Sequence, residues 1–256
     1  MKLAAVIPAR LSSSRFPRKV LFDLNNMPMV EHVRRRAEIS KVFDAGVYVA
    51  TCDQEVFDLV EKNGGFAIMT SKNHKNGTSR AAEAIENIDC THVVVLQGDE
   101  PLILPRHLKE FAIEISKNKT YHVWNGVSSI YEHDDFSNES IVKCAINKCN
   151  DILFCFRGKP FVSDFEIQSQ YTRKMLGLIA FRKKSIKEIN DCPADNLEIN
   201  EKIEQMRVVS LNYRIKSINL GESLPSVNLP SDVELVLQRM SHNKEQIELI
   251  RSYTYI

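Results

Sequence analysis

Long hydrophobic runs are missing from this sequence of 256 residues, and its longest apolar stretches are too short to span a bilayer. Residues 1–8 combine one basic residue with a short apolar run, which lacks the length of a signal-peptide core and is typical of a first strand. We therefore expect no membrane partner and a cytoplasmic location. The formal net charge is only +1, so no nucleic-acid partner is expected and any anion site must be local.

Metal-binding and redox patterns of cysteine are also absent. None of the six cysteines forms a CxxC pair, and no cysteine–histidine spacing matches a zinc site. Several cysteines lie in apolar runs, so we expect buried free thiols in a reducing compartment. The six are Cys52, Cys90, Cys144, Cys149, Cys155 and Cys192.

Two glycine-rich nucleotide motifs do not occur: the GxGxxG loop of dinucleotide-binding proteins and the GxxxxGK[ST] phosphate loop. A dinucleotide-dependent oxidoreductase is therefore a poor interpretation. The first predicted strand leads instead into a basic loop, residues 8–19, with three serines and no acidic residue. Its cations are Arg10, Arg15, Arg18 and Lys19. Such a loop suits a triphosphate; a solvated basic loop is the alternative, which its place after a buried strand disfavours.

Strands and amphipathic helices alternate through the first hundred residues. Strands are predicted at 2–7, 47–51, 66–70 and 91–96, and helices at 28–40, 55–63 and 81–86. This βαβαβ order predicts a parallel sheet with right-handed crossovers. A content of 43% hydrophobic and 26% charged residues is enough for an ordinary core, and the length suits one large α/β domain.

The second half is richer in hairpins. We expect strands at 123–130, 141–146, 152–156, 176–181 and 214–220, the last of them at a sheet edge, and helices at 108–116, 185–191, 197–208 and 232–240 with a tail to about 251. Residues 147–151 suit a hairpin turn. Residues 134–139 are expected to be a loop, and 158–173 a mobile loop over the site.

The segment around which the chain is organised is residues 91–101, THVVVLQGDEP. Its apolar run, 93–96, is typical of a strand buried on both faces. Gly98 lets the backbone turn and a ligand approach, and Asp99 and Glu100 then stand at the carboxyl end of a central strand, where α/β sheets bind ligands. Carboxylates there can hold Mg²⁺. A strand followed by an acidic surface turn explains the same residues.

A Gly77–Thr78 pair precedes the third predicted helix, where backbone N–H groups point outward. Thr78 could equally be the helix cap. The position of the pair between the third strand and the QGDEP strand favours a role in the same site.

Taken together, these motifs resemble those of the CMP-Kdo synthetases (3-deoxy-manno-octulosonate cytidylyltransferases) over essentially the whole chain. In family order they are IPAR-x-x-S-x-R-x-P-x-K-x-L at 7–21, MT-x₃-H-x-x-GT-x-R at 69–80, LQGDEP at 96–101, VK at 142–143, FxFR at 154–157 and LE-x₅-EQ-x-R at 197–207. The resemblance implies a Rossmann-like α/β nucleotidyltransferase fold, with a mostly parallel central sheet flanked by helices and a smaller hairpin-containing lobe. One domain over 1–256 would hold a nucleotide-binding half to about 120 and a sugar-binding and dimerisation part at about 121–256.

The resemblance also implies a reaction and partners. CTP and a 2-keto-3-deoxy sugar acid, Kdo or a related ulosonic acid, would give the CMP-sugar and pyrophosphate, by in-line attack of the anomeric hydroxyl on the α-phosphate with Mg²⁺ as cofactor. The enzyme would be a homodimer that serves lipopolysaccharide biosynthesis.

Site residues are carried over position by position. The implied catalytic residues are Arg15, Lys19 and Asp99, and the counterpart of Lys19 stabilises charge on the departing pyrophosphate. The nucleotide would be bound by Ala9, Arg10, Ser13, His74, Gly77, Thr78, Arg80 and Gln97, the sugar acid by Arg157, Glu204 and Gln205, and the metal by Asp99 and Asn228. A helix salt bridge between Glu204 and Arg207 is the alternative for that pair.

The departures from the family pattern concern the metal and the sugar. The family's GVDTP reads SVNLP here, so Asn228 keeps an oxygen ligand but loses a charge, and metal affinity should fall. The family's HLGIY reads MLGLI, with Met175 for a sugar-facing histidine and Ile179 for a tyrosine. Unmade hydrogen bonds to a sugar cost about 1–3 kcal/mol each. The loop after Arg157 lacks the second family arginine and reads Gly-Lys-Pro at 158–160. These departures leave two alternatives: the same chemistry on a different sugar acid, or a nucleotide-binding homologue with weak catalysis.

Overall fold

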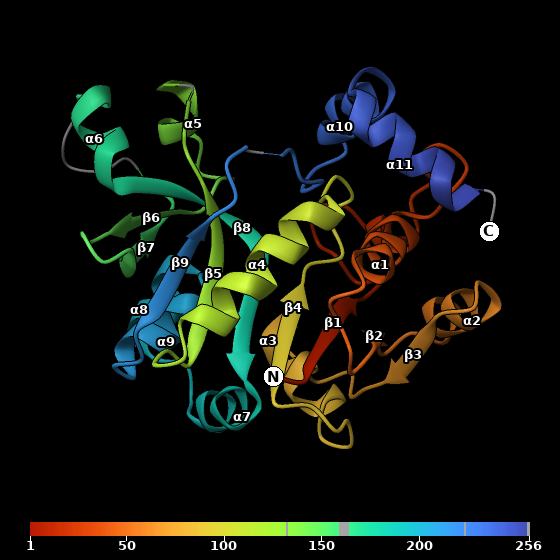
Figure 1. Cartoon of the computed structure of the whole chain (residues 1–256), viewed down its shortest axis with the longest axis horizontal. Coiled ribbons are helices and arrows are strands. Elements are labelled where there is room, and N and C mark those ends of the chain that lie inside the picture. Colours follow the sequence, from red (N-terminus) through yellow and green to blue (C-terminus); the bar gives the residue numbers. More distant parts are fainter. Residues whose placement is uncertain (132, 159–163, 223, 255–256) are drawn as a thin grey trace. The chain divides into compact units, whose positions relative to one another are not determined.

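The computed structural model describes residues 1–131, 133–158, 164–222 and 224–254. The chain divides into two compact units, one formed by Met1–Lys109 together with the segment from Leu224 onward, the other by Glu110–Ser223 (Figure 1). The expected division into a nucleotide-binding half to about 120 and a sugar-binding and dimerisation part after it stays a prediction. In the structure the segment from Leu224 onward belongs to the first unit.

The first unit is built on a parallel sheet with the strand order β3-β2-β1-β4. The strands are β1 (Leu3–Ala9), β2 (Val47–Thr51), β3 (Phe66–Met69) and β4 (His92–Leu96), and the connecting helices are α1 (Met29–Ser40), α2 (Gln54–Lys62) and α3 (Gly77–Ala84). The predicted α/β fold and its parallel βαβαβ order are confirmed. Because β1 and β4 are parallel neighbours, their carboxyl ends lie at the same sheet edge.

Two helices complete the first unit from the C-terminal side, α10 (Asp232–His242) and α11 (Lys244–Thr254). Figure 1 shows them in blue beside α1. Tyr253 of α11 is buried, and its hydroxyl lies 2.7 Å from Nδ1 of His32, while Arg35 donates to the Tyr253 carbonyl at 2.7 Å. Val227, Val236 and other apolar residues of this segment pack in one buried cluster with residues of the N-terminal half. The segment is therefore part of the core of the first unit.

The second unit contains five strands in the order β8-β5-β9-β7-β6, with a further pairing between β6 and β8 that joins the two ends of this order. The strands are β5 (Val123–Ser128), β6 (Lys143–Ile146), β7 (Asp151–Phe156), β8 (Thr172–Arg182) and β9 (Ile215–Asn219). The predicted hairpin joins β6 and β7 as antiparallel neighbours. Helix α4 (Pro105–Lys117) contains the boundary between the units.

Four expectations for the second unit were wrong. The last strand, β9, is no edge strand, because it pairs with both β5 and β7. Short helices, α5 (His133–Ser137) and α6 (Phe165–Tyr171), occupy stretches expected to be loops; residues 159–163 lie outside the described part. The single helix expected at 197–208 is two, α8 (Asn196–Glu201) and α9 (Gln205–Ser210), because Lys202 has a left-handed φ of 56°. Helix α7 (Lys183–Asp191) agrees with the sequence.

No helix in the described ranges combines the length and the apolar character needed to cross a membrane.

Candidate functional site

The centre of the candidate site is an ion pair at the carboxyl end of β4. Nζ of Lys19 lies 2.5 Å from Oδ2 of Asp99, and the two side chains are only 13% and 21% exposed. Lys19 begins a short 3₁₀ helix, Lys19–Leu21, and its ammonium also donates to the carbonyl of Val227 at 3.3 Å. One cation thus joins the basic loop, the QGDEP segment and the segment that precedes α10.

Asn228 reaches the same place although it is far away in sequence. Its Oδ1 accepts a hydrogen bond from Nη2 of Arg15 at 3.3 Å, and the preceding N–H, of Val227, donates to the carbonyl of Asp99 at 3.0 Å. Asp232 fixes this segment, because its Oδ2 accepts the backbone N–H groups of residues 228 and 229 at 2.8 Å each. The structure therefore brings together all three predicted catalytic residues and both predicted metal ligands.

The nucleotide side is formed by tightly packed backbone. A Cβ atom on Gly98 would lie 3.2 Å from the carbonyl oxygen of Pro8. A Cβ atom on Gly77 would lie 3.1 Å from Nε2 of Gln97 and 3.1 Å from Cγ of Pro8. A side chain at either position would have to displace these neighbours by a few tenths of an ångström. The φ of Gly98 is not positive, so close approach and not a turn favours glycine there. The ends of β1, which include Ala9, and of β4 thus meet the start of α3.

Helix α3 begins four residues earlier than predicted. Its cap is Asn76, whose side chain accepts the N–H of Ser79 at 2.9 Å, and Thr78 lies in the first turn. The alternative interpretation of Thr78 as the helix cap is therefore wrong.

His74 and Arg80 make contacts that order the segment between β3 and α3. Arg80 is buried and donates to Oγ1 of Thr70 and, at 3.3 Å, to the carbonyl of Ser71. Nε2 of His74 pairs with the carboxylate of Glu83. Burial raises the pKa of Glu83, but the hydrogen bonds from His74 and from the N–H of Ser71 outweigh it and the net pKa is lowered. A direct role of His74 and Arg80 in nucleotide binding stays a prediction.

In the second unit, Arg157 follows β7. Its Nη1 donates to the carbonyls of Glu139 and Ser140 at 3.1 and 3.4 Å. Lys143, to which we assigned no role, is buried beside it and donates to the carbonyls of Asn138 at 2.9 Å and Arg157 at 2.6 Å. Burial, helped by the charge of Arg157, lowers the pKa of Lys143 to about 8. The VK motif was the only signal for this lysine.

Gln205 is the first residue of α9, directly after Glu204, and its Nε2 donates to Oδ1 of Asn125 at 3.1 Å. Asn125 is fully buried at a register shift of β5 and donates to the carbonyl of Gly126 at 2.7 Å. Arg207, considered as a partner of Glu204, binds both carboxylate oxygens of Glu198 at 2.5 and 2.8 Å. Sequence reasoning missed Asn125, because no local pattern marks a buried amide.

The two apolar substitutions on β8 are both buried. Met175 and Ile179 pair with Val127 and Asn125 of β5. They place hydrocarbon where the family pattern has a histidine and a tyrosine.

The candidate metal ligands are few. In the part of the chain that the structure describes, no three His, Cys, Asp or Glu side chains gather as a metal cluster. The site offers one carboxylate, of Asp99, and one amide oxygen, of Asn228. Such hard oxygen donors fit Mg²⁺, which is usually held by one or two carboxylates together with substrate phosphates.

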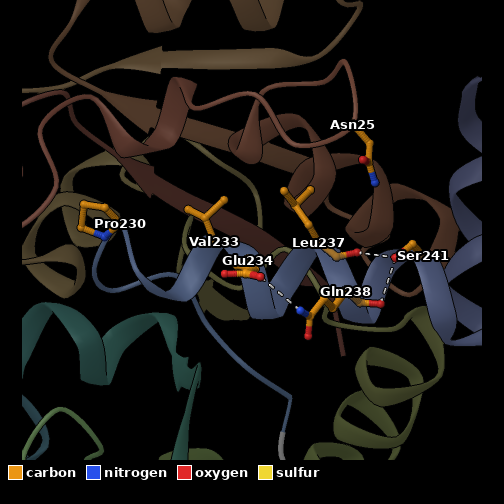
Figure 2. Close-up of a pocket in the computed structure, with 7 residues that line it drawn as sticks. All are labelled: Asn25, Pro230, Val233, Glu234, Leu237, Gln238 and Ser241. Atoms are coloured by element: carbon orange, nitrogen blue, oxygen red, sulfur yellow. Dashed lines mark hydrogen bonds between the residues drawn. The ribbon is translucent and has the colours of Figure 1, made fainter.

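A hollow of about 520 Å³ lies elsewhere in the first unit, along α10 (Figure 2). Its lining residues are Asn25, Pro230, Val233, Glu234, Leu237, Gln238 and Ser241. None of them is a predicted site residue.

Fold and site define a nucleotidyltransferase: a parallel sheet, a basic loop after its first strand and a lysine–aspartate pair at the end of a neighbouring strand. The cytidylyltransferase family model matches residues 4–217. The chain belongs to the cytidylyltransferases, and within them to the CMP-Kdo synthetase (3-deoxy-manno-octulosonate cytidylyltransferase) family.

The relatives cover nearly the whole chain. The 3-deoxy-manno-octulosonate cytidylyltransferase of Thermodesulfovibrio yellowstonii is 34% identical over 250 residues, which are 92% of this chain and 96% of that protein. The one from Flavobacterium johnsoniae is 32% identical over 238 residues, 91% and 96% of the two chains. A solved CMP:2-keto-3-deoxy-manno-octonic acid synthetase in complex with CTP is similar with a TM-score of 0.86 at 30% identity, over 94% of this chain and 99% of that one.

Proposed function

We propose that the protein is an enzyme that transfers the cytidylyl group of CTP to Kdo, or to a related 2-keto-3-deoxy sugar acid, with release of pyrophosphate. Two of its relatives carry the name of this activity, and a similar structure holds CTP. The observation that carries the proposal is the cluster of Arg15, Lys19, Asp99 and Asn228 at the carboxyl edge of the sheet in the first unit.

In the proposed reaction the anomeric hydroxyl oxygen bonds to the α-phosphorus, the bond from that phosphorus to the bridging oxygen breaks, and the hydroxyl proton passes to solvent. Negative charge grows on the departing pyrophosphate. Arg15 and Lys19 offset that charge, and Arg10 and Ser13 position the triphosphate, so that catalysis is mostly placement and electrostatic stabilisation. Asp99 and Asn228 would hold Mg²⁺, which supplies further neutralisation of the triphosphate when bound.

In the second unit, we assign contacts with the sugar acid to Arg157, Glu204 and Gln205. Buried Met175 and Ile179 favour a sugar acid that needs fewer hydrogen bonds at these positions than the family pattern provides. The same chemistry on an acid other than Kdo is therefore the second candidate.

The direct test is release of pyrophosphate by purified protein with Mg²⁺, CTP or UTP, and a panel of ulosonic acids that includes Kdo. We expect release at about 1 per second or faster with CTP and at least one acid. Tight CTP binding without release from any acid would favour a nucleotide-binding homologue, and no release combined with no CTP binding would contradict the proposal.

Restoring the second acidic ligand tests the metal assignment. We expect Asn228→Asp to lower the Mg²⁺ concentration for half-maximal rate about tenfold, because a charged oxygen ligand binds the ion more strongly. The control is Asn243→Asp, which adds the same charge in the same unit at the cap of α11, where the side-chain oxygen accepts the N–H of Gln246. An unchanged Mg²⁺ dependence in Asn228→Asp would show that residue 228 does not bind the metal.

The contact between Gln205 and Asn125 predicts a selective loss of sugar binding. We expect Asn125→Leu to raise KM for the sugar acid about tenfold and leave KM for CTP within twofold, because Gln205 loses the acceptor that orients it. Gln205→Leu should have a similar effect, and the double variant should add little, as expected for two residues that act through one contact. Additive losses in the double variant would contradict this account.

We also propose a cytoplasmic homodimer. No disulfide joins the six cysteines in the described part of the chain, as in a reducing compartment. The exposed apolar side chains of the second unit include Leu153 and Phe154 on β7 and Leu197 and Ile199 on α8, and these four favour burial against a second copy. The test compares the sedimentation of the wild type with that of the double variant Leu153→Asp/Ile199→Asp. A wild type that sediments as a monomer would contradict the dimer.

A further inference from the structure

Two backbone hydrogen bonds to one residue hold the basic loop in shape. The carbonyl of Leu11 accepts the N–H of Ser13 and the N–H of Arg18, both at 2.9 Å, so that both ends of the segment 11–18 are held at one point. The N–H of Leu11 does not face a ligand, because it donates to Oδ2 of Asp53 at 2.8 Å. The shape of the loop therefore depends on a carboxylate outside it.

Asp53 is itself held by the sheet. It lies two residues beyond the end of β2, its N–H donates to Oγ1 of buried Thr51 at 3.1 Å, and Sγ of Cys52 lies 3.7 Å from its Oδ2. Asp53 is the N-cap residue of α2, yet within the described part of the chain its side chain makes no capping hydrogen bond. A cap of this kind contributes about 1 kcal/mol. The carboxylate instead accepts a hydrogen bond from the backbone of the loop.

Two carboxylates outside the basic loop contact it. Residues 8–19 contain four cations and no acidic residue, so the cations repel one another without an anion of their own. The start of α2 supplies two carboxylates: Asp53 binds the loop backbone, and Glu55 binds the guanidinium of Arg18 at 2.5 Å. The Glu55 pair is exposed and contributes little. The partly buried Asp53 bond is the stronger of the two contacts.

We propose that Asp53 is a positioning residue of the triphosphate site, which fixes Leu11 and through it the placement of Arg10, Ser13 and Arg15. The inference rests on the proposed function, because it assumes that the loop binds the triphosphate of CTP. Asp53 acts through the backbone and touches neither the substrate nor the metal.

The test compares Asp53→Ala with Asp53→Asn. The alanine removes the acceptor, and we expect kcat/KM for CTP to fall 10- to 100-fold while KM for the sugar acid stays within twofold. The asparagine keeps a side-chain oxygen that accepts the Leu11 N–H, and we expect it to stay within about threefold of the wild type. Asp58→Ala is the matched control, because Asp58 is an exposed carboxylate on the same helix that accepts a hydrogen bond from Gln54 of that helix.

Calorimetric titration with CTP alone separates the two proposals. If the wild type does not bind CTP, the proposed function fails. If the wild type binds CTP and Asp53→Ala binds it equally well, the positioning role fails. An asparagine variant as impaired as the alanine variant would also overturn the positioning role. So would a rise of KM for CTP and of KM for the sugar acid together with a lowered Tm, because these changes would indicate a purely structural role.

Discussion

Replacing Lys19 by methionine is expected to lower kcat for pyrophosphate release about 10³-fold, with KM for the sugar acid little changed. The ammonium is mostly removed from water and lies between Asp99 and the Val227 carbonyl, so its charge is fixed in place before the reaction. A preorganised charge in such a site stabilises the developing negative charge far more than one in water does. A 10³-fold loss corresponds to about 4 kcal/mol of activation free energy.

The matched control is Lys62→Met, which removes the same charge from the exposed end of α2. The double variant Lys19→Met/Asp99→Asn separates loss of catalysis from the cost of leaving the Asp99 carboxylate unpaired. A kcat of Lys19→Met within tenfold of the wild type, measured at saturating CTP, would show that Lys19 is not a catalytic residue.

Acid is expected to destabilise the first unit well above the pH at which carboxylates protonate. Burial lowers the pKa of His32 to about 4, with the charges of Arg36 and Arg35 adding to the effect, and burial likewise lowers the pKa of His107 to about 4. Both imidazoles are buried and neutral when folded, whereas in the unfolded chain each has a pKa near 6.5. Protons then bind the unfolded state preferentially, and stability falls as pH decreases.

These pKa values set the direction of the change in stability and the pH range over which it occurs. The contribution is complete above pH 6.5 and is lost as pH falls toward 4, at about 3 kcal/mol for each histidine. Denaturant unfolding at pH 7, 5.5 and 4.5 measures the loss, and His32→Gln should remove about half of the pH dependence. Exposed His242 offers the control, since His242→Gln should leave it unchanged. A free energy of unfolding that is flat from pH 7 to 4.5 would contradict the prediction.

The fold of the first unit could be predicted from the sequence because its signals are local. Apolar runs indicated the strands, and because β1 and β4 are parallel neighbours the loop after β1 lies near Asp99 in the structure. Asn228 had no such signal: only the family pattern indicated it, and the contacts that bring it to Arg15 and Asp99 span more than a hundred residues.

The second unit shows what periodicity cannot detect. The apolar spacing at 197–208 continues through Lys202, but the left-handed backbone at that residue ends one helix before the next begins. The partners of Asp53 and Asn125 are likewise set by tertiary contacts, and neither residue type has a strong local pattern. The roles of Asp53 and Asn125 follow only from the three-dimensional structure, which brings each acceptor to its donor.

The return of the C-terminal segment to the first unit determines the order in which the protein can mature during synthesis. Residues 110–223 form a continuous stretch and leave the ribosome complete, whereas the first unit, begun earlier, waits for Val227, Asn228 and Tyr253. The half made first is therefore the half finished last. Until Tyr253 emerges, the buried imidazole of His32 and the guanidinium of Arg36 lack its hydroxyl as a partner, so a nascent chain stalled short of that residue should be captured by chaperones through its N-terminal part.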